Sequence, residues 1–239
     1  MVMHGSARPC ACIYVCAGLL IWGQVQVHAD SLAERFGSFD PLGVNSFALG
    51  QFATADGEGA TAIGYAANAA GDNSTAIGAF SSALGANSIA FGVQSLASGT
   101  NTVAFGNHSL ASGNNSVALG VESQATAANT TALGNHSLAS GANSTAVGVL
   151  SEASGANSQA IGNHSRASGD NSTAVGELSR AAGINTTAIG NLSKARGDNS
   201  VAVGILSMAA GENATAIGNQ SIASGANSSV VNATRFPAH

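Results

Sequence analysis

Residues 87–100 read NSIAFGVQSLASGT, and the next fourteen, residues 101–114, read NTVAFGNHSLASGN. A glycine stands at every fourteenth position from Gly50 to Gly218 without a slip, and a second glycine series follows seven residues later, interrupted only by Ala127. The repeat unit is Asn-Ser/Thr-x-Ala-Φ-Gly-x-x-Ser-x-Ala-x-Gly-x, in which Φ is an aliphatic residue or Phe. A period of this length predicts a solenoid, in which each repeat is one turn of the chain.

Fourteen residues are too few for a pair of helices but suffice for two strands of about five residues joined by two tight turns. Alternation such as Ser88-Ile89-Ala90-Phe91 is typical of a strand, and Gly and Asn are the residues that tight turns with positive φ favour. We therefore predict an all-β parallel roll of about thirteen coils stacked ~4.8 Å apart. If the turn at Ala127 needs positive φ, the substitution Ala127→Gly is expected to be neutral or mildly stabilising.

The alternation also predicts which side chains point inward. Ser or Thr and Ala share one face of each strand, so four small residues per coil are expected to fill a narrow interior, with the serine hydroxyls bonded to backbone groups of the turns. The opposite face of the first strand is a continuous apolar stripe of several hundred Å² by rough estimate, at or above what a soluble monomer normally exposes. We predict that this stripe is the interface between symmetric copies, formed by Ile77, Phe91, Phe105, Leu119, Leu133, Val147, Ile161, Val175, Ile189, Val203 and Ile217.

The outward positions of the second strand are mixed and polar, and we predict a ligand surface there. Its candidate residues are His108, His136, His164, Arg166, Arg180 and Lys194. The histidines recur in alternate coils, about 9.6 Å apart at the coil spacing, which is too far for one chain to share a metal ion among them. No metal site is therefore predicted.

The motifs Asn87–Gly92, Asn115–Gly120 and Asn199–Gly204, each followed by x-x-Ser-x-Ala, resemble the head repeats of trimeric autotransporter adhesins of the Yersinia adhesin type. The similarity covers roughly residues 44–232. The resemblance implies a left-handed parallel β-roll that assembles as a homotrimer on the bacterial surface, at the outer membrane of a Gram-negative cell. It also implies binding to host matrix proteins such as collagen, or to other cells and surfaces.

The flanks of the repeats have other predicted roles. Residues 1–29 are expected to be a signal peptide, with an apolar run of about 13 residues that is too short for a membrane span and ends in Val27-His28-Ala29. All three cysteines lie in this segment, so no disulfide and no membrane span is expected in the mature chain. Residues 30–43 are expected to be an N-terminal cap or linker, and residues 233–239 a truncated neck or tail, because no coiled-coil stalk or anchor follows the repeats.

Composition narrows the function further. Only 8% of the residues are charged and the net charge is −5, which argues against nucleic acid as a partner. No nucleophile and base stand together outside the repeat pattern, so neither an enzyme nor a cofactor is predicted. Aspartates in only three turns (72, 170 and 198) argue against a calcium-binding solenoid.

Two other functions remain open at this stage. Threonines recur in one outward position, as on ice-binding solenoids, but the neighbouring Phe91, Phe105 and Leu119 make that face bulky and uneven. A purely structural spacer is the other alternative, because the outer face shows no obvious pocket.

Overall fold

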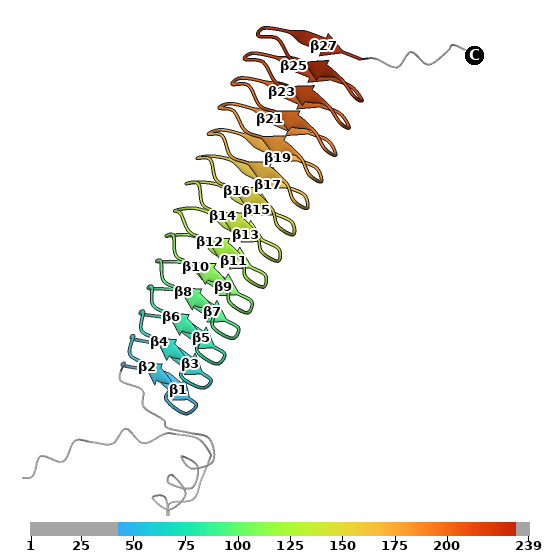
Figure 1. Cartoon of the computed structure of the whole chain (residues 1–239). Coiled ribbons are helices and arrows are strands. Elements are labelled where there is room, and N and C mark those ends of the chain that lie inside the picture. Colours follow the sequence, from blue (N-terminus) through green and yellow to red (C-terminus); the bar gives the residue numbers. More distant parts are fainter. Residues whose placement is uncertain (1–42, 233–239) are drawn as a thin grey trace, which may run out of the picture.

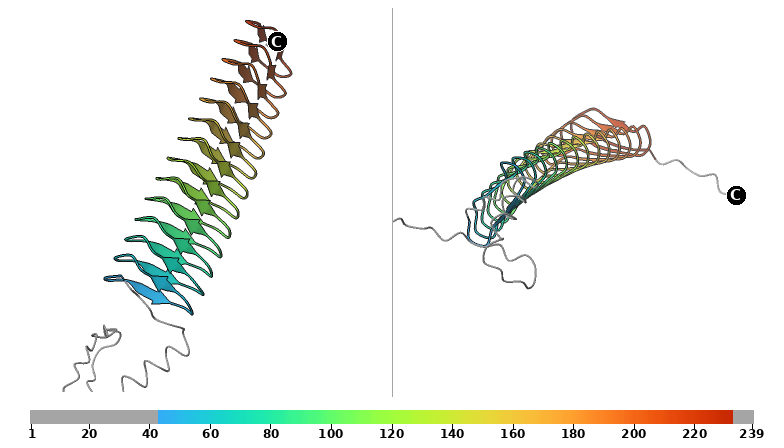
Figure 2. Two further views of the ribbon diagram at one scale, coloured as in Figure 1. Left: turned by 60° about the vertical axis from the view of Figure 1, so that its left-hand side comes forward. Right: turned by 90° about the horizontal axis from the view of Figure 1, so that it is seen from below.

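A computed structural model describes residues 43–232, which form one stack of flattened coils (Figure 1). Each coil supplies one strand to a 14-stranded sheet and one to a 13-stranded sheet, so odd-numbered strands lie in the first sheet and even-numbered strands in the second. The views along and across the rod show the coils lying over one another as flat loops (Figure 2). The prediction of an all-β solenoid of about thirteen coils is confirmed. Its left-handed winding stays a prediction.

The strands are shorter than the five residues expected. Those of the first sheet have three residues each: β1 (Phe47–Leu49), β3 (Thr61–Ile63), β5 (Thr75–Ile77), β7 (Ile89–Phe91), β9 (Val103–Phe105), β11 (Val117–Leu119), β13 (Thr131–Leu133), β15 (Thr145–Val147), β17 (Gln159–Ile161), β19 (Thr173–Val175), β21 (Thr187–Ile189), β23 (Val201–Val203), β25 (Thr215–Ile217) and β27 (Ser229–Val231).

The strands of the second sheet have two residues each. They are β2 (Thr54–Ala55), β4 (Asn68–Ala69), β6 (Ser82–Ala83), β8 (Leu96–Ala97), β10 (Leu110–Ala111), β12 (Gln124–Ala125), β14 (Leu138–Ala139), β16 (Glu152–Ala153), β18 (Arg166–Ala167), β20 (Arg180–Ala181), β22 (Lys194–Ala195), β24 (Met208–Ala209) and β26 (Ile222–Ala223). The turns occupy the rest of each coil, which explains why so little is left for the strands.

The register places each residue directly beside the residue fourteen positions away. Ile89 pairs with Thr75 on one side and with Val103 on the other, always in parallel. The fourteen-residue period of the sequence is therefore the same as the register of the strands. As a result, each position of the repeat forms a column of side chains along the rod.

The interior holds only small side chains. Ala90 and Ala97 are fully buried, and so is Ser88. The same pattern holds along the rod, where alanine, serine and threonine make up the whole core. The prediction of a narrow interior filled by four small residues per coil is confirmed, and it follows that the two sheets lie too close together for larger side chains.

The expectation that the buried hydroxyls bond to turn carbonyls is met in part: within residues 43–232, eleven of the 21 buried Ser and Thr hydroxyls do so and nine have no partner. The Ser95 hydroxyl donates to the Gly92 carbonyl at 3.0 Å, and the Thr102 hydroxyl, in the other sheet, donates to the Gly99 carbonyl at 2.8 Å. Some of the serines make no such bond: within residues 43–232, the hydroxyl of Ser116 is buried without a partner. The serine positions are therefore alike in size but not in hydrogen bonding.

The two glycine series have different physical causes. Gly92 in the first series has φ of 131°, and a Cβ there would lie 2.6 Å from the carbonyl carbon of Gly106. Gly85 in the second series has no positive φ, but a Cβ there would overlap the carbonyl oxygen of Gly99 in the next coil. The premise of the Ala127→Gly prediction was therefore wrong, because close approach of the coils, not positive φ, selects glycine in this series.

A ladder of asparagine side chains runs along one turn. Asn143 is typical: its Oδ1 accepts from Asn129 at 2.9 Å and its Nδ2 donates to Asn157 at 3.2 Å. Equivalent bonds join every coil from Asn87 to Asn199. Each of these asparagines also has positive φ, so one residue type meets both the conformational and the hydrogen-bonding needs of the turn.

No helix among residues 43–232 combines the length and the apolar character that crossing a bilayer requires.

Candidate ligand-binding groove

A shallow groove lies on the outer side of the second sheet and follows the rod for several coils. Strands β14 to β22 and the turns that precede them position its side chains. It is lined by His136, Leu138, Leu150, Ser151, Glu152, His164, Ser165, Arg166, Leu178, Ser179, Arg180, Leu192 and Lys194. The serines belong to the buried core, so the groove presents leucine, histidine and charged side chains to a ligand.

One wall of the groove is a row of turn residues that we call the crest. In each coil from residue 136 to residue 192 the crest residue directly precedes a buried serine and has left-handed backbone geometry, with φ between 54° and 59°. This corrects the sequence-based placement of His108, His136 and His164 on the second strand. They lie in the turn, because each two-residue strand begins two positions later.

The other wall is a column of charged strand residues. Arg166 pairs in register with Arg180, and Arg180 with Lys194, so three cationic side chains stack in consecutive coils. Glu152, one coil before, forms an ion pair with Arg166. This ion pair partly neutralises the positive charge at this end of the groove. Arg180 and Lys194 lie in the two following coils, farther from Glu152.

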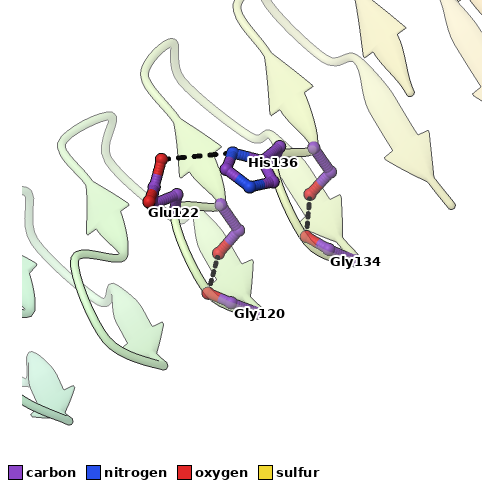
Figure 3. Close-up of polar contacts among 6 residues, drawn as sticks. Gly120, Glu122, Gly134 and His136 are labelled. Atoms are coloured by element: carbon purple, nitrogen blue, oxygen red, sulfur yellow. Dashed lines mark hydrogen bonds and ion pairs between the residues drawn. The ribbon is translucent and has the colours of Figure 1, made fainter. Parts of the chain in front are cut away.

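The crest has its own polar contact at the start of the groove. Nδ1 of His136 lies 3.1 Å from Oε2 of Glu122 in the preceding coil, and both side chains are about half exposed. Figure 3 shows the two side chains pointing toward each other across neighbouring coils, beside the core hydroxyls that bond the carbonyls of Gly120 and Gly134. Contacts between coils thus use side chains fourteen residues apart.

The structure brings five of the six predicted ligand-surface residues into this one groove: His136, His164, Arg166, Arg180 and Lys194. His108 is not among the groove residues, because it lies two coils before His136 along the crest. The leucines of the crest occupy the same outward position of the repeat as the histidines, but they were not among the predicted ligand-surface residues. Their fourteen-residue spacing from the histidines is the signal that could have included them.

The apolar stripe lies on the other sheet. Its eleven predicted residues all project outward from odd-numbered strands between β5 and β25, in one column. Phe91 and Phe105 are 41% and 48% exposed, and their rings stack at a centroid distance of 4.7 Å with an interplanar angle of 4°. Its role as an interface between copies stays a prediction.

A second aromatic group was not predicted. Phe52, Tyr65 and Phe80 lie in the turns of the first coils, with centroids 5.7 Å and 5.3 Å apart in edge-to-face geometry. All three side chains are exposed.

The aspartates considered for calcium have a structural task. Oδ1 of Asp170 accepts from the amide of Ala156 at 2.9 Å, and Oδ1 of Asp198 accepts from the amide of Ile184 at 2.9 Å. Asn114 does the same for Thr100. These side chains bond the backbone of the preceding coil, and in the part of the chain that the structure describes no three His, Cys, Asp or Glu residues come together in a way that could hold a metal ion.

These features define a class of protein: a repetitive β-solenoid with an apolar sheet on one side and a charged groove on the other. Comparison with known proteins agrees. The family model of the YadA head domain repeat matches successive segments between residues 42 and 231.

Among solved structures, the crystal structure of the collagen-binding domain of Yersinia adhesin YadA is 27% identical in sequence. The match covers 69% of this chain and 68% of that chain, with a TM-score of 0.26. Because the TM-score is this low, the superposition gives no further support to the fold. No curated protein matched the sequence.

Because the repeat model matches nearly all of residues 42–231, the chain belongs to the family of YadA head domain repeats, the heads of trimeric autotransporter adhesins.

Proposed function

We propose that this chain is the exported adhesive head of a bacterial surface protein, which attaches the bacterium to host extracellular matrix, cells or other surfaces as a homotrimer. The observation that carries the proposal is the family match over successive repeats, combined with an apolar sheet face that the chain itself leaves exposed. In this proposal residues 1–29 direct export and are removed. The repeats of residues 44–232 form the head.

The stripe supports self-association. Side chains such as Phe105, Ile161 and Ile189 are exposed on the first sheet and lie in one column. Exposed apolar surface of this extent is unfavourable in water, at about 25 cal/mol for each Å² that could be buried. Cyclic symmetry brings identical stripes together along one axis and leaves no copy unpaired. Three copies are what the family resemblance implies.

Such an assembly leaves the second sheet facing outward. The groove and its cations lie on that sheet, so the same rotation that buries the stripe presents three copies of the groove to the surroundings. Multivalent display of a weak site raises the effective affinity for a polymeric or surface-bound ligand. This arrangement suits attachment better than it suits capture of a single small molecule.

The experiment tests assembly and attachment together. Phe105→Asp places a charge in the stripe, and Leu110→Asp places the same charge on the second sheet as the matched control. Sedimentation at micromolar concentration is expected to give a trimer for the wild type and for Leu110→Asp, and dissociation for Phe105→Asp. Folded wild-type monomers would refute the trimer.

Attachment is measured with the same proteins on surfaces coated with collagen, fibronectin, laminin or cultured cells. The wild type is expected to bind at least one of these more strongly than an uncoated surface, and the dissociated variant is expected to bind more weakly because multivalency is lost. If a stable trimer bound none of them, the adhesive role would be refuted in favour of a structural spacer.

A further inference from the structure

We propose that the groove binds a linear acidic polysaccharide lying along the rod axis, with its acidic groups at Arg180 and Lys194 and its sugar faces on Leu178 and Leu192. The inference rests on the proposed adhesive function and names the class of ligand that this site takes. Two independent features of the groove carry it, one electrostatic and one conformational.

The electrostatic feature is a stack of three cations, two of which have no ion-pair partner within residues 43–232. All four Lys and Arg residues among residues 43–232 fall within one stretch, from Arg166 to Arg196, although the whole chain has a net charge of −5. Like charges directly opposite one another on paired strands destabilise a sheet. Arg166 has Glu152 as a partner, and the described residues offer no ion pair to Arg180 or Lys194. An anion in the groove would turn this repulsion into attraction.

The conformational feature is the leucine content of the crest. A left-handed backbone is unfavourable for every residue with a Cβ, and least so for Asn. The other left-handed turn position follows this rule, since Asn occupies it in nearly every coil. The crest position has no Asn in any described coil from Phe52 to Gln220. Within the groove it holds Leu150, Leu178 and Leu192, whose side chains are partly or largely exposed. Because these left-handed leucines keep much of their apolar surface exposed to solvent, that surface is available for an intermolecular contact.

The combination selects one class of ligand. A row of apolar side chains beside a row of cations fits a polymer that has both apolar ring faces and regularly spaced acidic groups. The rod repeats at ~4.8 Å, so such a polymer meets a similar contact at each coil.

Two other occupants fit less well. An extended acidic peptide binds a sheet mainly by adding a strand, but the amides of Arg180 and Lys194 already donate to the carbonyls of Ser193 and Ser207 in the next coil. A flat anionic membrane does not follow a concave groove. Both become outcomes of the test.

The first arm of the experiment uses one polymer with and without charge. The purified trimeric head is titrated with dextran sulfate and with unmodified dextran at low salt. Dextran sulfate is expected to bind and dextran is not, and the affinity is expected to fall as salt rises. Arg180→Gln combined with Lys194→Gln is expected to weaken binding at least about tenfold, a change of roughly 1.4 kcal/mol.

Arg196→Gln is the matched control for charge. It removes the same charge two residues beyond Lys194, outside the groove lining. Binding is expected to change by less than about threefold, because screening weakens a charge that does not touch the ligand. Equal losses from the Arg196 and Lys194 single variants would overturn the proposed site in favour of diffuse charge attraction.

The second arm separates the crest from stability. Leu178→Asn and Leu192→Asn remove apolar contacts while favouring the left-handed turn, so the melting temperature is expected to stay equal or rise. Affinity for dextran sulfate is nevertheless expected to fall several-fold. Leu206→Asn makes the same change at a crest position outside the groove lining and is expected to bind as the wild type does. Unchanged binding of both groove variants would refute the role of the crest.

The remaining outcomes bear on the ligand class and on the adhesive function separately. Poly-glutamate or anionic vesicles binding as tightly as dextran sulfate would overturn the choice of a polysaccharide. A head that adheres to matrix or cells but does not bind dextran sulfate would refute this inference and leave the proposed function intact. A head that binds dextran sulfate through the groove but attaches to no surface would support this inference and refute the proposed adhesive function.

Discussion

The asparagine ladder makes a quantitative prediction at its middle. Asn143 has φ of 58° and bonds to its neighbours on both sides, accepting from Asn129 and donating to Asn157. Asn143→Ala removes both hydrogen bonds and places a Cβ residue without a compensating side chain in a left-handed turn. Asn143→Gly removes the same hydrogen bonds but tolerates the turn, as Gly59 already does in the equivalent position.

The two terms can be estimated separately. The left-handed backbone costs about 1–2 kcal/mol for alanine. The two side-chain hydrogen bonds lie at the surface, so each contributes only about 0.5 kcal/mol, the low end for an intramolecular bond. The alanine variant is therefore expected to lose about 2–3 kcal/mol of unfolding free energy. The glycine variant should lose about 1.4–2 kcal/mol once the greater entropy of its unfolded chain is included.

Urea unfolding followed by circular dichroism measures the difference, at one fixed protein concentration because the proposed assembly would make stability depend on concentration. Equal slopes for the three proteins are required for the comparison. If the glycine and alanine variants were equally unstable, the backbone term would be refuted. If both matched the wild type, the ladder would contribute nothing to stability.

Four further substitutions test the core and one of the turns. Ala118→Leu forces three extra carbons between the sheets and is expected to lose about 3 kcal/mol or to abolish folding; a stable variant in a melting experiment would show that the sheets can move apart. Ser137→Ala removes a hydroxyl bonded to a turn carbonyl at 2.9 Å and is expected to cost about 1 kcal/mol in urea unfolding. Ser116→Ala removes a hydroxyl that has no partner within residues 43–232 and should cost close to nothing. A larger loss for Ser116→Ala than for Ser137→Ala would contradict the bonding pattern. Gly92→Ala combines positive φ with a Cβ 2.6 Å from the carbonyl carbon of Gly106, and is expected to cost at least about 3 kcal/mol from strain and crowding together. A thermal unfolding midpoint within a degree or two of the wild type would mean that this turn has another conformation available.

The amino-acid sequence alone determined the solenoid, its period and the direction of its side chains. The reason is that a repeat imposes the same local environment in every coil. Ser88 and Ala90 could therefore be assigned to the interior, and Ile89 and Phe91 to the exterior, from alternation confirmed over many copies. Family resemblance added the expectation of three copies and of a role at the cell surface, which no local pattern contains.

The tertiary structure decided which columns adjoin one another and why each turn residue is present. Glycine is required at position 85 by a neighbouring carbonyl and not by positive φ, because the two coils approach closely there. That distance cannot be read from a one-dimensional sequence pattern. The structure also decided how far the groove extends: Leu178 and Arg180 share its lining with His136 and Lys194, four coils apart, whereas His108 lies outside it. Periodicity specifies what recurs along the rod, whereas contacts across a coil depend on the turn geometry that brings the columns together.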